Sequence, residues 1–141
     1  MDYHTCTHEV RSYELDRYNH VNNAAYLNYL EYGRICFLRD YNFNYRKFVD
    51  SGFSLFVTHI SISYKRPSGL GDILTICTIP IKKRLTGGTF RQIIKKEGVL
   101  ICEAEVSWAS INGEGKPCRI PEEYEFPELF PAGDSKSPRT E

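Results

Sequence analysis

The residues best suited to catalysis lie in a polar segment near the start of the chain. Asp16 stands in a loop that follows a predicted strand, and an apolar helix is predicted to begin shortly afterwards, at Asn22. A helix start presents unpaired backbone N–H groups at the positive end of its dipole, and such groups stabilise an oxyanion developing on a carbonyl. A carboxylate just upstream can attack that carbonyl or activate a water beside it. The arrangement predicts acyl transfer or hydrolysis.

The same residues also suit a purely structural role. Asp16 and Asn19 are typical loop-forming residues, and Asn22 or Asn23 is suited to cap the helix. A single loop histidine such as His20 is more often a surface residue than a catalyst. Residue types and spacing alone therefore leave both interpretations open.

A long helix, from about 22 to 40, must position these groups. Tyr26, Leu30, Gly33 and Phe37 recur at helical spacing and form one apolar stripe. Four further apolar side chains widen this surface: Leu27, Tyr29, Ile35 and Leu38. Only a narrow sector remains polar, and it contains Asn28, Glu31 and Arg34. A helix this apolar is expected to be wrapped by other structure.

The other elements are predicted to be mainly strands, one before the helix and four after it. Their approximate ranges are 7–13, 53–65, 72–84, 89–96 and 100–108, with a short helical turn at 45–51. Gly87-Gly88 and Glu97-Gly98 are predicted turns, and apolar and polar residues alternate along the last strand. These elements predict an α+β fold in which an antiparallel sheet curls around the helix.

Composition restricts the class of protein. The chain has 141 residues, and its 18 basic and 18 acidic side chains give a formal net charge of zero. Neutrality argues against a nucleic-acid partner, and no run approaches the ~20 apolar residues needed to cross a membrane. Five cysteines without a C-x-x-C pair predict reduced thiols in the cytoplasm. We expect one domain over 1–130, a disordered tail over 131–141, and no cofactor.

One segment resembles a known enzyme family. The run D-R-Y-N-H-V-N-N-A-A-Y-L-N-Y-L-E-Y-G-R at 16–34 is similar to the signature of hot-dog-fold acyl-CoA thioesterases of the 4-hydroxybenzoyl-CoA thioesterase type. Its H-V-N-N-x-x-Y core also resembles that of acyl-carrier-protein thioesterases. Similar segments follow in order, I-S-I-S-Y-K-R-P-S-G-L-G-D from Ile60 and N-G-E-G-K-P-C-R-I-P from Asn112. The resemblance covers about 7–121 and implies a hot-dog fold, a long central helix wrapped by a five-stranded antiparallel sheet.

The resemblance also implies roles for individual residues. Asp16 matches the catalytic carboxylate, acting as nucleophile or general base, and Asn23 matches the position whose backbone N–H polarises the thioester carbonyl. His20 stands where many relatives carry His. Glu14 stands in the place of a second acid, and Asn19 replaces a common Gly while still tolerating left-handed backbone geometry.

The substrate implied is an acyl-CoA, possibly an acyl-carrier-protein thioester, with a fatty or aromatic acyl group. Tyr26 and His59 are predicted to bind the substrate, although His59 also suits an interface between subunits. The phosphates of coenzyme A need cations, and basic residues gather at strand ends. The candidates are Lys65, Arg66, Lys82, Lys83, Arg84 and Arg91, with Lys95 and Lys96 beside them. His4, Cys6 and His8 alternate along a predicted extended segment, but no fourth ligand is near, and we assign no metal site.

Three activities remain open at this stage. The first is hydrolysis of an acyl thioester at Asp16; the second is a non-catalytic hot-dog module that binds acyl-CoA or an acyl carrier protein. The third is a hot-dog hydratase or dehydratase, whose Asp and His hydration motif is not evident. The resemblance further implies a homodimer or homotetramer with the active site at a subunit boundary.

Overall fold

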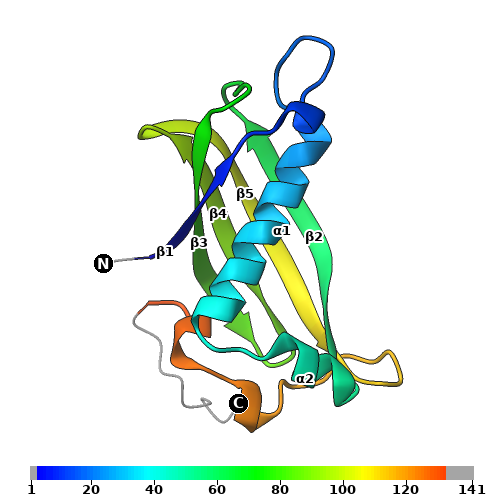
Figure 1. Cartoon of the computed structure of the whole chain (residues 1–141). Helices are drawn as coiled ribbons and strands as arrows, with labels where there is room; N and C mark the ends of the chain where they lie inside the picture. The colour runs from blue at the N-terminus through cyan, green and yellow to red at the C-terminus, as the bar shows by residue number, and fades with distance from the viewer. Residues whose placement is uncertain (1–2, 133–141) are drawn as a thin grey trace. The chain divides into compact units, whose positions relative to one another are not determined.

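A computed structural model describes residues 3–132 of the chain, and its elements match the predicted α+β class (Figure 1). A single five-stranded sheet has the order β1-β3-β4-β5-β2, with β1 antiparallel to β3. The elements are β1 (His4–Glu9), η1 (Ser12–Glu14), α1 (Asn23–Asp40), α2 (Tyr45–Asp50), β2 (Ser54–Tyr64), β3 (Ile73–Arg84), β4 (Gly87–Lys96), β5 (Val99–Ile111), η2 (Glu122–Tyr124) and η3 (Pro127–Leu129).

The chain divides into two compact units. The first unit contains the described residues of Met1–Phe37 together with Ile62–Thr78 and Gln92–Ala104. The second contains Leu38–Ser61, Ile79–Arg91 and the described residues of Glu105–Glu141. Asp16 and Asn23 both lie in the first unit.

Helix α1 buries the predicted stripe within the first unit. Tyr26, Leu30, Gly33 and Phe37 are all buried, because their spacing places them on one face of the helix. A Cβ added at Gly33 would lie 2.6 Å from Cγ2 of Ile76, so glycine allows β3 to approach the helix backbone closely. Leu27 and Ile35 are exposed in the single chain, so the apolar surface of α1 is wider than its buried stripe.

Strand β5 confirms the predicted period of two. Cys102, Ala104, Val106 and Trp108 are buried, and Glu105, which points to the other side, is exposed. The turn at Glu97-Gly98 is also confirmed, since both residues have positive φ, 49° and 79°.

The predicted turn at Gly87-Gly88 is wrong. Both glycines belong to β4, and the turn consists of Leu85 and Thr86 instead. A Cβ at Gly87 would collide with the carbonyl oxygen of Trp108, and one at Gly88 would lie 2.8 Å from the carbonyl oxygen of Lys82. Glycine is needed here for close approach of neighbouring strands rather than for turn geometry.

Residues 3–132 contain neither a membrane-spanning helix nor a cluster of metal ligands. None of their helices is long and apolar enough to cross a bilayer, and residues 3–132 hold no cluster of three or more His, Cys, Asp or Glu side chains arranged for a metal. His4, Cys6 and His8 share the less exposed face of β1, as alternation predicts. Of the predicted tail over 131–141, residues 133–141 lie outside the described part of the chain.

Candidate active site

The loop that carries Asp16 is closed by the carboxylate itself. Oδ1 of Asp16 accepts hydrogen bonds from the backbone N–H groups of Tyr18 and His20, at 2.8 and 3.2 Å. The backbone N–H of Asp16 donates to the carbonyl of His20 at 2.7 Å. Asn19 has φ of 65°, which confirms that asparagine adopts the left-handed geometry expected at this position. Both bonds end on Oδ1, so Oδ2 has no hydrogen-bond partner among residues 3–132.

Backbone pairing brings the two ends of this loop together. Leu15 and Val21 form an antiparallel bridge, and the N–H of Asn22 donates to the carbonyl of Glu14 at 2.9 Å. The N–H of Val21 donates to the carbonyl of Ser68 at 2.9 Å, which ties the loop to the segment after β2. The loop with its carboxylate therefore closes directly before the first residue of α1.

The start of α1 leaves one backbone donor available. Oδ1 of Asn22 accepts from the N–H of Ala24 at 2.8 Å, and its carbonyl accepts from the N–H of Ala25 at 2.9 Å, so Asn22 caps the helix. The N–H of Asn23 meets no acceptor within the part of the chain that the structure describes. An unpaired N–H at the positive end of a helix dipole is suited to bind a carbonyl oxygen.

Tyrosine side chains pack behind the helix start. The hydroxyl of Tyr26 lies 2.7 Å from Oγ of Ser68, and both residues are buried. Burial raises the pKa of Tyr26 above its ordinary value, so its hydroxyl stays neutral at physiological pH. The hydroxyl of Tyr64 donates to the carbonyl of Asn23 at 3.2 Å and leaves that residue's N–H untouched.

A partly buried carboxylate lies two positions before Asp16. Glu14 accepts hydrogen bonds from the backbone N–H of Arg11 and the hydroxyl of Tyr29, and its carboxylate also pairs with His8. The family resemblance implied only a second acid at this position. Its partners were missed because the contacts of Glu14 with β1 and α1 depend on the tertiary fold, and no local spacing signals them.

Some predicted site residues lie in the first unit beside the loop and others do not. The side chain of His20 is exposed, and only its backbone contacts Asp16. Lys65 and Arg66 are exposed and precede Ser68 by a few positions. The remaining predicted residues belong to the second unit: His59, Lys82, Lys83, Arg84 and Arg91.

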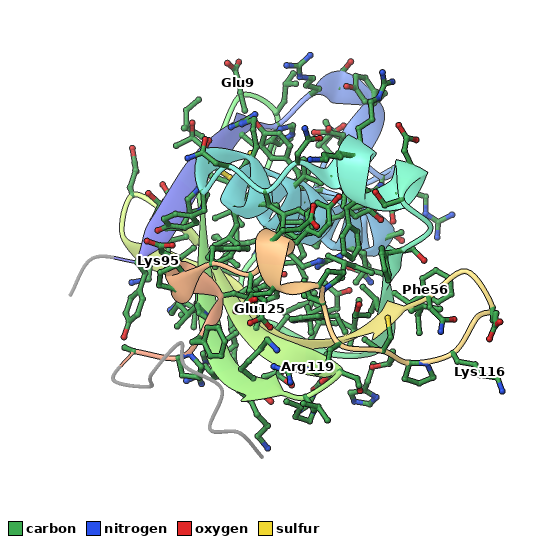
Figure 2. The ribbon with its side chains drawn as sticks, turned by 90° about the horizontal axis from the view of Figure 1, so that it is seen from below. Glu9, Phe56, Lys95, Lys116, Arg119 and Glu125 are labelled. Carbon is green, nitrogen blue, oxygen red and sulfur yellow. The ribbon has the colours of Figure 1, made fainter. Side chains whose placement is uncertain are left out.

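Several of these cations already have partners. Lys83, whose side chain is 5% exposed, forms an ion pair at 3.7 Å with Glu125. Figure 2 labels Glu125. Arg84 donates to the carbonyl of Gly88 and to Oγ1 of Thr89, both at 3.0 Å. Lys96 pairs with Asp72 at 3.0 Å in the first unit, while Lys95 beside it is exposed.

Known proteins resemble this chain over most of its length. Residues 10–125 match the family model of the thioesterase-like superfamily. The long-chain acyl-CoA thioesterase FadM of Escherichia coli is 33% identical over 106 residues, which are 74% of this chain and 80% of that protein. The chloroplastic acyl-acyl carrier protein thioesterase ATL2 of Arabidopsis thaliana is 30% identical over 84% of this chain, which spans 64% of the plant protein.

Solved structures agree with the fold. A probable thioesterase from Bartonella henselae superposes with a TM-score of 0.82 at 31% identity, and the match covers 85% of this chain and all of that one. Its likeness confirms the predicted hot-dog arrangement of one long helix and a five-stranded antiparallel sheet. The chain therefore belongs to the thioesterase-like superfamily and is a thioester hydrolase.

Proposed function

We propose that the chain hydrolyses an acyl-CoA or acyl-carrier-protein thioester with Asp16 as the catalytic carboxylate. One observation carries the proposal: the N–H of Asn23 lacks an acceptor at a helix start that directly follows the loop holding Asp16. The names of the similar enzymes, an acyl-CoA thioesterase and an acyl-carrier-protein thioesterase, support the substrate class.

The proposed reaction uses the two groups together. The thioester oxygen accepts a hydrogen bond from the N–H of Asn23, which stabilises negative charge as the carbonyl carbon becomes tetrahedral. The free Oδ2 of Asp16 either removes a proton from an attacking water or attacks that carbon itself, in which case water then cleaves the resulting anhydride. In both routes the C–S bond breaks, the leaving thiolate takes up a proton, and the acyl group is released as the free acid. Anchoring one carboxylate oxygen in the loop keeps the other oriented, which lowers the entropic cost of the attack.

Lys65 and Arg66 are proposed to contact the phosphates of coenzyme A. Both are exposed, and their backbone N–H groups donate to the carbonyl of Ile101 at 2.8 and 3.1 Å, which fixes the backbone. Nη1 of Arg66 also donates to the carbonyl of Leu100 at 3.4 Å, a bond that uses only one of the five N–H groups of the guanidinium. Ser68 follows closely and is bonded to Val21 at the end of the Asp16 loop. The two cations are thus attached to the same segment as the site.

A panel of thioesters tests this function. Free-thiol release is measured with fatty acyl-CoAs of several lengths, an aromatic acyl-CoA and an acyl-pantetheine that lacks the nucleotide. We expect turnover of at least one acyl-CoA, and Lys65→Ala with Arg66→Ala is expected to raise its KM by roughly tenfold because charge-assisted contacts are lost. The KM for acyl-pantetheine should not change. No release from any thioester would contradict the proposed function.

We propose that the chain works as a homodimer or homotetramer, with strand β2 at a subunit boundary. β2 is the last strand in the sheet order, and its residues 56–59 are exposed. An uncharged, exposed edge strand is a template for pairing with another strand, and monomeric proteins usually protect such edges with Lys or Pro. Ser54–Tyr64 contains neither.

A matched pair of substitutions tests the role of β2. Val57 and Val99 are exposed to nearly the same extent, 45% and 46%, and lie on β2 and β5 respectively. Val57→Lys is expected to shift the mass in light scattering toward the monomer value of 16.3 kDa, because it places a charge in the interface. Val99→Lys should keep the oligomer. A wild-type monomer with full activity would contradict the assembly proposed here.

We also propose a cytoplasmic location. The five cysteines form no disulfide bond among residues 3–132. Reduced thiols persist in compartments kept reducing by glutathione and thioredoxin, which supports the cytoplasm.

A further inference from the structure

Glu14 collects hydrogen bonds from three successive elements of the first unit. Its Oε1 accepts from the backbone N–H of Arg11 at 2.8 Å and from the hydroxyl of Tyr29 on α1 at 2.9 Å. Nε2 of His8 on β1 lies 3.0 and 3.2 Å from its two oxygens. One carboxylate therefore connects β1, η1 and α1.

This carboxylate is charged and largely removed from water. The side chains of His8 and Glu14 are 18% and 13% exposed, and Tyr29 is buried. Burial by itself raises the pKa of Glu14, but the hydrogen bonds from Arg11, His8 and Tyr29 outweigh it, and the pKa is lowered. The pKa of Tyr29 is raised by burial and by its bond to Glu14, so Tyr29 stays a neutral donor. Charge-assisted bonds of this kind are stronger than neutral ones.

The backbone of Glu14 holds both parts of the proposed site. Its carbonyl accepts from the N–H of Asn22, the cap residue directly before Asn23. On its other side, Leu15 pairs with Val21 and leads into Asp16. A shift of Glu14 would therefore move the carboxylate of Asp16 and the helix start relative to each other.

We propose that Glu14, held by His8 and Tyr29, is a positioning residue that sets the catalytic geometry of Asp16 and the N–H of Asn23. The inference rests on the proposed role of Asp16. Glu14 itself touches no substrate in this scheme, since its carboxylate is occupied by protein donors. It acts by fixing the base of the loop, and a misplacement of about 1 Å is enough to cost on the order of 10²-fold in rate.

Two tyrosines provide a matched test. Tyr29→Phe removes the hydroxyl that binds Glu14, whereas Tyr124→Phe removes one that lies 3.2 Å from Oγ of Ser51 in the second unit. We expect Tyr29→Phe to lower kcat by roughly fivefold with KM nearly unchanged, because the loop is displaced while substrate contacts remain. Tyr124→Phe should retain wild-type kcat. Equal kcat values for the two variants would overturn the proposal.

A double-mutant cycle separates positioning from general destabilisation. Glu14→Ala is expected to lower single-turnover hydrolysis by roughly 10–100-fold in the wild type and by less than about twofold in the Asp16→Asn background, since Glu14 acts through Asp16. Glu14→Gln, which keeps an acceptor oxygen, should restore part of the rate. An equal loss from Glu14→Ala in both backgrounds overturns the positioning role.

The same cycle distinguishes failure of this inference from failure of the proposed function. If Asp16→Asn hydrolyses the thioester as fast as wild type, the catalytic role proposed for Asp16 is wrong. The positioning role of Glu14, which rests on it, is then wrong as well. If Asp16→Asn is slow and Glu14→Ala is fast, only the role of Glu14 fails. Should Glu14→Ala not fold, the comparison of Tyr29→Phe with Tyr124→Phe decides.

Discussion

Asp16→Asn is expected to lower kcat for acyl-CoA hydrolysis by about 10²–10⁴-fold, the range that a positioned catalytic base contributes. Asparagine has nearly the shape of aspartate, and its Oδ1 can still accept from the N–H groups of Tyr18 and His20. The loop should therefore keep its conformation. What is lost is the charge on the second oxygen, which both nucleophilic attack and proton removal require.

Thermal unfolding and two further variants complete this test. Asp16→Ala removes both loop hydrogen bonds as well as the charge, so we expect it to lose kcat and also some stability, at about 1 kcal/mol per bond. Asp16→Asn should unfold near the wild-type temperature. His20→Ala is expected to change kcat little, since the imidazole is exposed and only the backbone of His20 binds Asp16 among residues 3–132. Wild-type turnover in Asp16→Asn would contradict the catalytic role.

The catalytic and structural interpretations of the loop residues turn out to be compatible. Asp16 does shape its loop, as one interpretation predicted, but it uses only Oδ1 to do so. Asn22 does cap the helix, yet the cap leaves the N–H of the next residue unpaired. The hydrogen bonds that shape the loop and cap the helix thus leave one carboxylate oxygen and one backbone N–H available for catalysis.

The parts of the fold that were predicted correctly are those governed by local periodicity. The stripe on α1 and the alternation along β5 follow from the geometry of single elements, and the structure confirms both. The first strand was predicted at about 7–13, but β1 ends at Glu9 and Ser12–Glu14 forms a short 3-10 helix. Gly87 was misplaced because its role depends on Trp108 in another strand, which no local pattern reveals.

Long-range contacts also account for what the sequence did not reveal about the site. The bunching of Lys82, Lys83 and Arg84 suggested a phosphate site, but Lys83 pairs with Glu125 and Arg84 binds its own turn. Some basic residues at strand ends therefore have structural partners, and composition cannot distinguish these residues from ones that bind phosphate. Glu14 is the opposite case, because its carboxylate is partly buried and bonded to His8 and Tyr29 rather than left in solvent.

The second large effect is expected from Asn23→Pro, which removes a single backbone N–H. Asn23 is the first residue of α1, the position at which proline is best tolerated because its missing N–H has no helical partner and its φ already suits a helix. The carbonyl of Asn23 remains free to accept from Tyr64. The helix should therefore form, while the proposed oxyanion donor is absent.

Loss of one oxyanion donor typically lowers kcat by about 10²–10³-fold, and we expect a loss of this size in Asn23→Pro with KM affected much less. Asn23→Ala is the matched control, since it removes the same exposed side chain but keeps the N–H, and it should retain nearly full activity. Circular dichroism checks that both variants keep the helix. If Asn23→Pro folds and hydrolyses the thioester at the wild-type rate, the carbonyl oxygen is stabilised elsewhere. If Asn23→Ala is as slow as Asn23→Pro, the side chain rather than the backbone carries the effect.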